Sequence, residues 1–402
     1  MTSGSMGSLE SLRRLNRLRV IGTLRDHGTI SRAEIARRTG LSRSTVSSLV
    51  ADLQASGLVV EREEGAGRRS QGGRPPILLS FDTSAGVALG INFDHRSLRV
   101  AVADLSARVL AEGARELDID HEAEEGLDAA AALIEGALEE AGVDRMRVIG
   151  AGVGLPAPID RETGIVGSSA ILPGWVGVRA VEELRRRLDV PVLVDNDANL
   201  GALAEAAYGA GRGAEDFVYV MLSSGIGAGL ILHGRLYRGS AGLAGELGHV
   251  LVDPDGPVCR CGNRGCLETA AAGPALVELL RRSHGDGLTV REMLRLALAG
   301  DHGCARVIAD AGRAVGSAVA PLCNVLNPSL LVVGGELALA GELLLDGVRE
   351  SVNRWALPAA AEVLEIVPGA LGERAEVLGA VALVVSESDQ LSTRLAAEAG
   401  VP

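Results

Sequence analysis

Three cysteines and a histidine lie close together in the second half of the chain. Cys259, Cys261 and Cys266 have the spacing C-x-C-x4-C, and His249 lies ten residues before the first cysteine. Three thiolates and one imidazole form a complete tetrahedral ligand set for Zn2+ and leave no position open for a metal-bound water. The spacing therefore predicts a structural zinc site. A disulfide is the alternative, but it would leave one of the three cysteines unpaired.

Two carboxylates stand beside the predicted zinc ligands. Glu246 lies three residues before His249, and Glu268 lies two residues after Cys266. If one ring nitrogen of His249 binds zinc, the other can bind a ligand hydroxyl, and the two glutamates can accept hydrogen bonds from neighbouring hydroxyls. The pattern therefore predicts a polyol site next to the metal.

The whole stretch, E-x-G-H followed by C-x-C-G-x-x-G-C-L-E, resembles the signature of the ROK family of repressors, open reading frames and sugar kinases. The resemblance continues along most of the chain after about residue 85 and includes xylose- and N-acetylglucosamine-responsive repressors. It implies an α/β fold with a two-lobed, actin-like domain related to sugar kinases and ribonuclease H. In that family the histidine and the three cysteines hold zinc, and the two glutamates and the histidine bind sugar hydroxyls.

The charge of the chain is unevenly distributed. Residues 1–80 contain 13 arginines and 7 acidic residues, a net charge of +6, whereas the remaining residues have a net charge of −19. A basic head on an acidic body is expected when only one module contacts phosphates. Apolar runs stay shorter than the ~18 residues of a membrane span, and the N-terminus does not resemble a secretion signal. We therefore expect a cytoplasmic protein that does not enter membranes and keeps its cysteines reduced.

Residues 12–82 are expected to form the basic head, behind a tail over residues 1–11 whose small and polar residues predict disorder. Apolar residues at helical spacing predict a first helix that ends at Gly28. Ser31 and Ser42 can each cap a further helix. The head is therefore expected to contain three helices joined by short turns.

Two short strands are predicted after the third helix, at 58–60 and 74–79, with a glycine- and arginine-rich tip between them. Helix, turn, helix and hairpin together predict a winged helix-turn-helix. The third helix places polar residues near its N-terminus, where recognition helices meet bases and phosphates, and the tip can reach a minor groove or the DNA backbone. The alternative is a small helical bundle that contacts another protein. The candidate DNA-binding residues are Arg43, Ser44, Thr45 and Ser47 on the helix and Arg68, Arg69 and Arg74 on the wing.

Residues 83–402 are expected to form the sensing domain, because strands and helices alternate after residue 82. The smaller lobe is predicted over about 83–195 together with the C-terminal helix, and the larger lobe over about 196–385. Ligands gather at the ends of strands in such folds. The loops after the apolar runs 148–153 and 192–194 are therefore expected to line the site.

The second of these loops, at 195–199, is rich in Asp and Asn. In the ROK sugar kinases that it resembles, the aspartate matching Asp197 takes the proton from the sugar hydroxyl, and Asn196 binds an adjacent hydroxyl. Such clusters also cap helices, so Asp195 or Asn199 is expected to cap the next helix while the middle pair faces the cleft. The predicted sugar site is Asn196, Asp197, Glu246, His249 and Glu268.

The turn at 92–96 distinguishes a kinase from a sensor. Actin-like sugar kinases begin with D-x-G-x-T at this place, where the aspartate orients Mg2+ and the glycine lets the backbone approach the phosphates. Here Asn92, Asp94 and Arg96 replace these residues. An amide lacks the anionic oxygen that Mg2+ prefers, and a carboxylate at 94 repels a triphosphate. We therefore expect a chain that binds sugar without phosphorylating it, with Asp197 as a vestigial base.

Together these features predict a sugar-responsive transcriptional regulator, and within that class a repressor of carbohydrate uptake or catabolism genes. Its expected partners are double-stranded operator DNA and a monosaccharide effector, its expected cofactor is structural Zn2+, and the family resemblance implies a homodimer or homotetramer. Hexoses, pentoses and N-acetylated sugars fit the predicted site equally well. Two alternatives remain open: an active ATP-dependent sugar kinase with a DNA-binding head, and a zinc-stabilised protein-interaction module.

Overall fold

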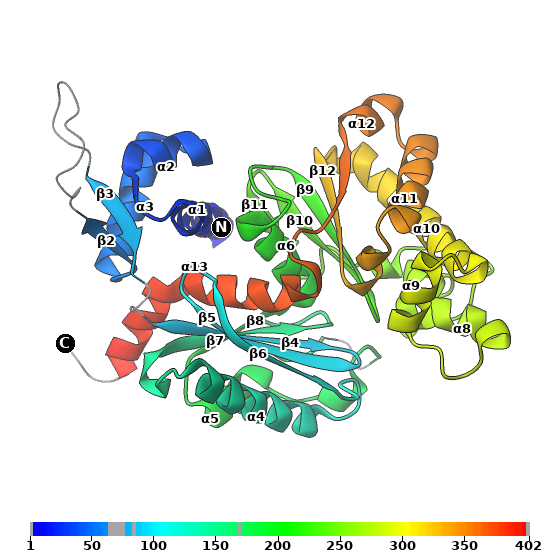
Figure 1. Cartoon of the computed structure of the whole chain (residues 1–402), viewed down its shortest axis with the longest axis horizontal. Helices are drawn as coiled ribbons and strands as arrows, with labels where there is room; N and C mark the ends of the chain where they lie inside the picture. The colour runs from blue at the N-terminus through cyan, green and yellow to red at the C-terminus, as the bar shows by residue number, and fades with distance from the viewer. Residues whose placement is uncertain (1–2, 63–76, 83–85, 162, 168–169, 399–402) are drawn as a thin grey trace.

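The computed structural model describes residues 3–62, 77–82, 86–161, 163–167 and 170–398. The chain forms a small N-terminal head and two larger lobes, and the long helix α13 (Ala375–Glu398) lies between the head and one of the lobes (Figure 1). None of the described helices is long and apolar enough to cross a membrane.

The head is a winged helix-turn-helix. Ser31 caps the second helix by accepting a hydrogen bond from the backbone N–H of Glu34, and Ser42 caps the third helix by accepting one from the N–H of Thr45. Both predicted helix starts are therefore confirmed. The elements are α1 (Ser3–His27), β1 (Ile30–Ser31), α2 (Arg32–Thr39), α3 (Arg43–Ala55), β2 (Val59–Arg62) and β3 (Leu78–Phe81).

The first helix is longer than expected. Because α1 begins at Ser3, the prediction of a disordered tail over residues 1–11 is wrong from Ser3 onward. A helix extends more easily than it nucleates. The part of α1 that is anchored by the buried residues Leu15 and Leu18 therefore continues into a segment whose composition alone predicted disorder.

The wing differs from the expectation in its strand positions. Within the described residues the return strand is β3 at 78–81, which extends two residues beyond the predicted end at 79 and pairs with β2 in the register Val59↔Phe81; the predicted residues 74–76 lie outside them. Strand β1, which was not predicted, adds a third strand by pairing with β3. The predicted wing residues Arg68, Arg69 and Arg74 lie outside the described residues.

The two lobes repeat one sheet topology, which confirms the predicted two-lobed α/β fold. The strand orders are β6-β5-β4-β7-β8 and β11-β10-β9-β12-β13. In each sheet the first three strands are antiparallel neighbours and the last two are parallel additions. The strands of the smaller lobe are β4 (Val87–Asp94), β5 (Ser97–Asp104), β6 (Val109–Glu116), β7 (Val148–Leu155) and β8 (Val192–Asn196). Those of the larger lobe are β9 (Phe217–Leu222), β10 (Ile226–Leu232), β11 (Arg235–Tyr237), β12 (Leu330–Gly334) and β13 (Glu365–Pro368).

Each lobe also contains helices (Figure 1). In the smaller lobe these are α4 (Ala123–Ala141) and α5 (Ala180–Leu188). In the larger lobe they are α6 (Asp197–Tyr208), α7 (Leu267–Ala271), α8 (Gly273–His284), α9 (Val290–Leu298), α10 (His302–Leu326), α11 (Glu342–Trp355) and α12 (Pro358–Val363). Short 3-10 turns are η1 (Arg145–Arg147), η2 (Pro173–Trp175), η3 (Leu247–His249), η4 (Glu336–Ala340) and η5 (Gly372–Arg374).

Helices α6 and α13 pack closely against each other between the two lobes. A Cβ on Gly379 of α13 would overlap the carbonyl oxygen of Leu200 in α6, and a Cβ on Gly152 of β7 would overlap the carbonyl oxygen of Ala380. Glycine is therefore required where the sheet, α13 and α6 approach one another. The two helices form the joint between the lobes.

The head shares its hydrophobic core with this joint. Leu18 and Leu24 of α1 belong to the same buried cluster as Ala207 of α6 and Val384 of α13. A Cβ on Gly22 would lie 2.9 Å from the carbonyl oxygen of Ala207, so α1 and α6 also meet backbone to backbone. A movement of α6 must therefore be accommodated by the head.

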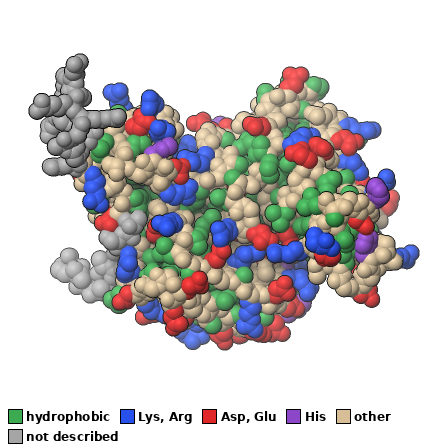
Figure 2. All heavy atoms as spheres, in the orientation of Figure 1, with side chains coloured by type: hydrophobic (Ala, Val, Ile, Leu, Met, Phe, Trp, Pro, Cys, Tyr) green, Lys and Arg blue, Asp and Glu red, His purple; other side chains and the backbone are tan. Residues whose placement is uncertain are grey.

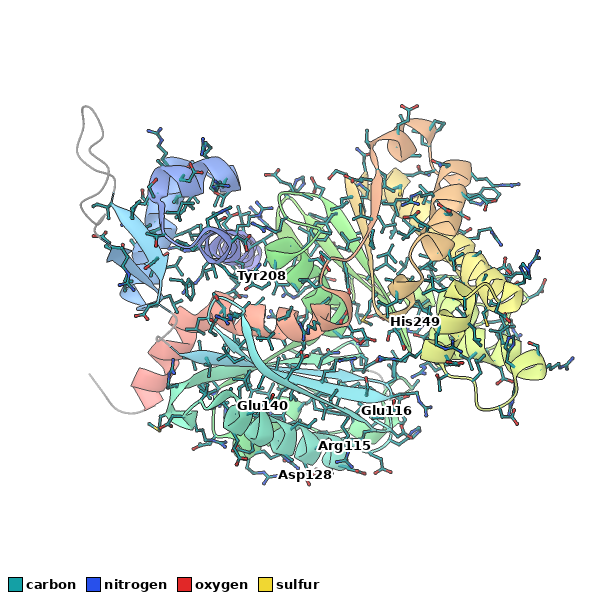
Figure 3. All side chains as sticks on the ribbon, in the orientation of Figure 1. Arg115, Glu116, Asp128, Glu140, Tyr208 and His249 are labelled. Carbon is teal, nitrogen blue, oxygen red and sulfur yellow. The ribbon has the colours of Figure 1, made fainter. Side chains whose placement is uncertain are left out.

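Polar contacts also hold the head against α6 and α13. The Arg14 guanidinium lies 2.9 Å from the Glu387 carboxylate of α13, and the Arg25 guanidinium lies 4.7 Å from the ring centroid of Tyr208 at the end of α6 (Figure 3). Desolvated charge pairs and cation–π contacts favour one orientation of the partners. The head is thus fixed to both joint helices.

Candidate functional site

A pocket lies at the carboxyl ends of β7 and β8, beside the start of β10. Its empty space, including the part open to solvent, is about 410 Å3. His249 lies where the two lobes face each other (Figure 3). All five predicted sugar-binding residues line this pocket: Asn196, Asp197, Glu246, His249 and Glu268.

The four predicted zinc ligands come together beside the pocket. Their ligand atoms lie within 4.8 Å of one another. The His249 Nδ1 atom is 3.6 Å from the Cys259 Sγ atom, and the Sγ atoms of Cys261 and Cys266 are 3.7 Å apart. Zn–S bonds of about 2.3 Å and Zn–N bonds of about 2.0 Å at tetrahedral angles would place ligand atoms roughly 3.5–3.8 Å apart, so this geometry fits Zn2+.

The cysteines of the cluster are available as metal ligands, but a bound cation would be needed to keep them deprotonated. All five cysteines are free, which argues against the disulfide alternative. Burial, and then contacts with the other two thiols, raises the pKa of Cys266 to about 12. Because thiolates are the metal-binding form, a bound cation would have to compensate for this cost. Gly262 (φ 92°) and Gly265 (φ 67°) adopt left-handed conformations that turn the loop between ligands.

The two nitrogens of His249 face different partners, as the sequence predicts. Nδ1 points to the thiol cluster, whereas Nε2 lies 3.9 Å from the Glu246 carboxylate in the pocket. This ring can therefore bind metal on one side and a ligand hydroxyl on the other.

The helix cap in the 195–199 loop is not the predicted one. Asn196 itself caps α6, because its Oδ1 accepts a hydrogen bond from the N–H of Asn199, and the helix begins at Asp197. Asp195 is instead buried and accepts hydrogen bonds from Arg238 Nε and Nη2 at 2.9 and 2.6 Å, with Arg161 3.2 Å away. The Asn196 side chain therefore faces the pocket with only its amide nitrogen, which lies 3.5 Å from the Ala157 carbonyl oxygen.

Burial and mutual repulsion raise the pKa values of two pocket carboxylates, Asp197 and Glu246. Burial, and then the charges of Asp94 and Glu376, raises the pKa of Asp197 well above its usual range. Burial, and then the charge of Glu268, raises the pKa of Glu246 to about 6. One oxygen of Asp197 has no hydrogen-bond partner within the described part of the chain, although the residue is 2% exposed. A buried polar atom without a partner is costly, and a ligand hydroxyl would satisfy it.

A second buried carboxylate lies behind the pocket, where α13 meets β9. Glu376 is fully buried, and the Tyr219 hydroxyl donates a hydrogen bond of 2.7 Å to it. Burial, and then the charges of Asp94 and Glu205, raises the pKa of Glu376 to about 7 despite this bond. The carboxyl group is therefore neutral below pH 7 and is forced to ionise above it.

Replacing Glu376 by glutamine is expected to stabilise the protein at high pH. An acid with a raised pKa loses stability as pH rises from its unfolded value near 4.5 to its folded value near 7, and glutamine removes this loss, a gain of up to about 3 kcal/mol at pH 8. Urea unfolding of wild type and Glu376→Gln at pH 5 and pH 8 measures it. The gain should be small at pH 5 and absent at both pH values in Glu362→Gln on the exposed side of α12. An equal effect at both pH values would contradict the assignment.

The turn after β4 contacts the turn after β9 through hydrogen bonds. The Asp94 carboxylate accepts hydrogen bonds from the hydroxyls of Ser223, at 3.2 Å, and Ser224. A carboxylate thus joins the two turns, one from each lobe. Asn92 is buried beside it, and its Oδ1 atom has no partner among the described residues.

One pocket residue, His95, was missed by the sequence analysis. It follows Asp94, is 6% exposed, and lines the pocket together with Glu268. Its Nδ1 atom lies 2.6 Å from an oxygen of Asp120, which also pairs with Arg260 of the zinc loop. Only its position within the altered 92–96 turn could have drawn attention to it.

The predicted recognition residues have different surroundings. Arg43, Ser44 and Ser47 are exposed on α3, where they are free to meet DNA. Thr45 is half-buried, and its hydroxyl lies 2.7 Å from the Ser42 hydroxyl in the helix cap. Thr45 therefore belongs to the cap as well as to the candidate DNA surface. Figure 2 shows basic side chains spread over the head on the face in view.

Comparisons with known proteins cover almost the entire chain. The ROK family matches residues 88–387, and the MarR family matches residues 14–70. The xylose repressor of Caldicellulosiruptor bescii is 32% identical over 395 residues, which are 95% of this chain and 98% of that protein.

Solved structures agree with this result. The crystal structure of a ROK family transcriptional regulator, a homologue of the Mlc protein of Escherichia coli, has a TM-score of 0.74 and 25% identity and covers 96% of this chain and 99% of its own. A ROK family glucokinase from Streptomyces griseus, in complex with glucose and AMPPNP, has a TM-score of 0.67 and 31% identity and covers 74% of this chain and 99% of its own. The match over residues 88–387, together with a repressor relative that shares nearly its full length, shows that this chain belongs to the ROK family.

Proposed function

We propose that this protein is a sugar-responsive transcriptional repressor that binds a monosaccharide between its lobes and operator DNA through its head. The observation that supports this most strongly is the combination of two sites in one chain. Five side chains of the kind that bind sugar hydroxyls line one pocket. The winged helix-turn-helix shares a hydrophobic core with α6, the helix that begins in that pocket. The xylose repressor is similar in sequence over 95% of this chain, and the regulator structure has a similar fold over 96% of it.

We propose that the sugar is bound without being phosphorylated. Asp94 lies in the turn at which actin-like sugar kinases approach the nucleotide phosphates, and Ser223 and Ser224 donate hydrogen bonds to it. An incoming triphosphate would therefore meet a carboxylate where phosphoryl transfer requires positive charge. Because a ROK family glucokinase has a similar fold, this proposal can be tested with the assay used for a sugar kinase.

A coupled assay of ADP release with ATP and Mg2+ is expected to show no turnover above background with D-glucose, D-xylose or N-acetyl-D-glucosamine. The same pocket should bind one of these sugars in a calorimetric titration. Turnover that disappears in Asp197→Asn would instead identify a working kinase.

Helix α6 is the proposed link between sugar and head. Asp197 at its first residue lines the pocket, and Tyr208 at its last residue contacts Arg25 of α1. Twelve residues of helix span roughly 18 Å, so one rigid element connects the two sites. Closure of the lobes on a sugar would shift α6 and, with it, the surface against which α1 packs. The ligand biases the head only by its differential affinity for the open and closed forms.

The proposed DNA surface is the exposed N-terminal half of α3. Arg43→Ala is expected to weaken operator binding about tenfold and to reduce the slope of log affinity against log salt by about one, because one phosphate or base contact is lost. Fluorescence anisotropy with labelled upstream DNA measures both quantities. The matched control is Arg37→Ala on α2, whose charge is already paired with Glu34. Equal losses in both variants would contradict a specific role for α3.

The remaining assignments follow from these proposals. His249, Cys259, Cys261 and Cys266 would hold a structural Zn2+ that shapes the pocket wall, and chromosomal operator DNA implies action in the cytoplasm. Two-fold DNA sites favour a homodimer or homotetramer, because half-site spacing mirrors protein symmetry. Light scattering during size exclusion would measure the assembly.

A further inference from the structure

His95 is held in the pocket wall by a network that crosses from one lobe to the other. Its Nδ1 atom lies 2.6 Å from the Oδ1 atom of Asp120, and both residues belong to the smaller lobe. Arg260 in the zinc loop donates a hydrogen bond to the other oxygen of Asp120 at 3.0 Å, and its Nε lies 3.4 Å from Glu268. The ring is therefore fixed before any ligand arrives.

The network also defines which nitrogen faces the ligand. His95 Nδ1 lies 2.6 Å from Asp120 Oδ1, which accepts hydrogen bonds, and 3.2 Å from the Arg260 guanidinium. In the neutral ring with its proton on Nδ1, directed at Asp120, Nε2 is the acceptor. Nε2 has no partner among the described residues. A Cβ on Gly225 would lie 3.1 Å from this nitrogen and 3.2 Å from the Glu268 Oε2 atom, so both atoms lie beside Gly225 in the lining of the same pocket.

The charges around the pocket limit the kind of ligand. Among the described residues that line it, none is Arg or Lys, whereas Asp197, Glu246 and Glu268 are acidic. The nearby Arg260 is engaged by Asp120 and Glu268. An anionic group such as a phosphate would therefore meet carboxylates without a free cation, but a polyol would meet several acceptors for its hydroxyl protons.

We propose that His95 is an additional ligand of the effector, that its Nε2 atom accepts a hydrogen bond from a sugar hydroxyl, and that the completed pocket takes an uncharged, unphosphorylated sugar. This inference rests on the proposed sugar-sensing function. It adds a specificity-determining residue from the smaller lobe, so the sugar is held from both lobes. His95 and Asn196 of the smaller lobe would bind it from one side, and Asp197, Glu246, His249 and Glu268 of the larger lobe from the other.

Calorimetric titration of the full chain with D-xylose, D-glucose, N-acetyl-D-glucosamine and glucose 6-phosphate tests this proposal. His95→Ala is expected to weaken binding of the preferred neutral sugar about tenfold, as the loss of one buried hydrogen bond implies. His95→Gln, whose amide can reach the position of Nε2, should bind within about threefold of wild type. The matched control is His121→Ala, because His121 makes a similar 3.0 Å contact with Asp118 on the exposed surface. Thermal unfolding of each variant verifies that it is folded.

The outcomes separate this inference from the function on which it rests. If His95→Ala and His95→Gln bind the sugar as tightly as wild type, His95 is not a ligand, while the sugar-sensing function stands. If wild type binds only glucose 6-phosphate, the assignment of an uncharged ligand is wrong. If wild type binds none of the four probes, both this inference and the proposed function are overturned.

Discussion

Replacing Cys266 by serine is expected to unfold the zinc loop and to lower the free energy of unfolding of the protein by at least about 3 kcal/mol. Cys266 is 1% exposed, lies between the two other cysteines and the pocket residue Glu268, and pairs with Leu251 through an isolated β-bridge. Leu251 and Val258, which lie beside the ligand residues, are exposed, so a bound metal would supply much of the stability of the loop. Thermal unfolding with and without a chelator, together with the zinc content per chain, measures the effect.

The control for this substitution is Cys323→Ala. Cys323 is equally buried but lies in α10, apart from the His249 cluster, so this variant should keep one zinc per chain and respond to the chelator like wild type. A wild-type protein without zinc, or a Cys266→Ser variant as stable as wild type, would show that the loop needs no metal.

Replacing Glu246 by glutamine is expected to abolish the response to sugar. Its carboxylate faces the pocket beside Glu268 and His249 Nε2, and a hydrogen bond to a charged acceptor contributes about 1.5–3 kcal/mol, so affinity should fall roughly 10- to 100-fold. Operator affinity without sugar should not change, because Glu246 lies outside the head. Calorimetry with sugar and anisotropy with labelled DNA measure the two quantities separately.

Asp255→Asn serves as the matched control for Glu246→Gln. Asp255 is an exposed acidic residue in the zinc loop, so removal of its charge tests for a general electrostatic effect. Equal losses of sugar affinity in both variants, or loss of operator binding in Glu246→Gln alone, would contradict a direct role of Glu246 in the pocket.

Local patterns explain why much of the site was predictable. The loop at 259–266 contains three of the four predicted zinc ligands within eight residues, so their spacing already restricts their geometry. Ser31 and Ser42 mark helix starts because their hydroxyls need only a neighbour three residues away. Interactions of this kind are encoded over short stretches of sequence.

Features that depend on distant residues were missed. His95 became a pocket residue only because Asp120 and Arg260, 25 and 165 positions away, fix its ring. Asn196 rather than Asp195 caps α6, because Arg238 and Arg161 engage Asp195. Although burial alone raises it, the pKa of Asp195 is lowered by these two charges, which keep the carboxylate ionised and occupied.

The position of the head was also beyond the sequence pattern. The apolar stripe of its first helix predicted a buried face without naming its partner, and Leu18 and Leu24 share a cluster with α6 and α13. A stripe shows that a helix face is buried without showing which partner buries it. Because of this shared core, we expect that binding of a sugar between the lobes changes the position of the DNA-binding head.

The most direct test of this account is the affinity of the full chain for its upstream DNA, measured by anisotropy with and without the neutral sugar that binds the pocket. We expect that saturating sugar changes this affinity by at least about tenfold, the range of a coupling free energy of 1–3 kcal/mol, and that Glu246→Gln shows no such change. Identical DNA affinity with and without a sugar that demonstrably binds wild type would contradict the account.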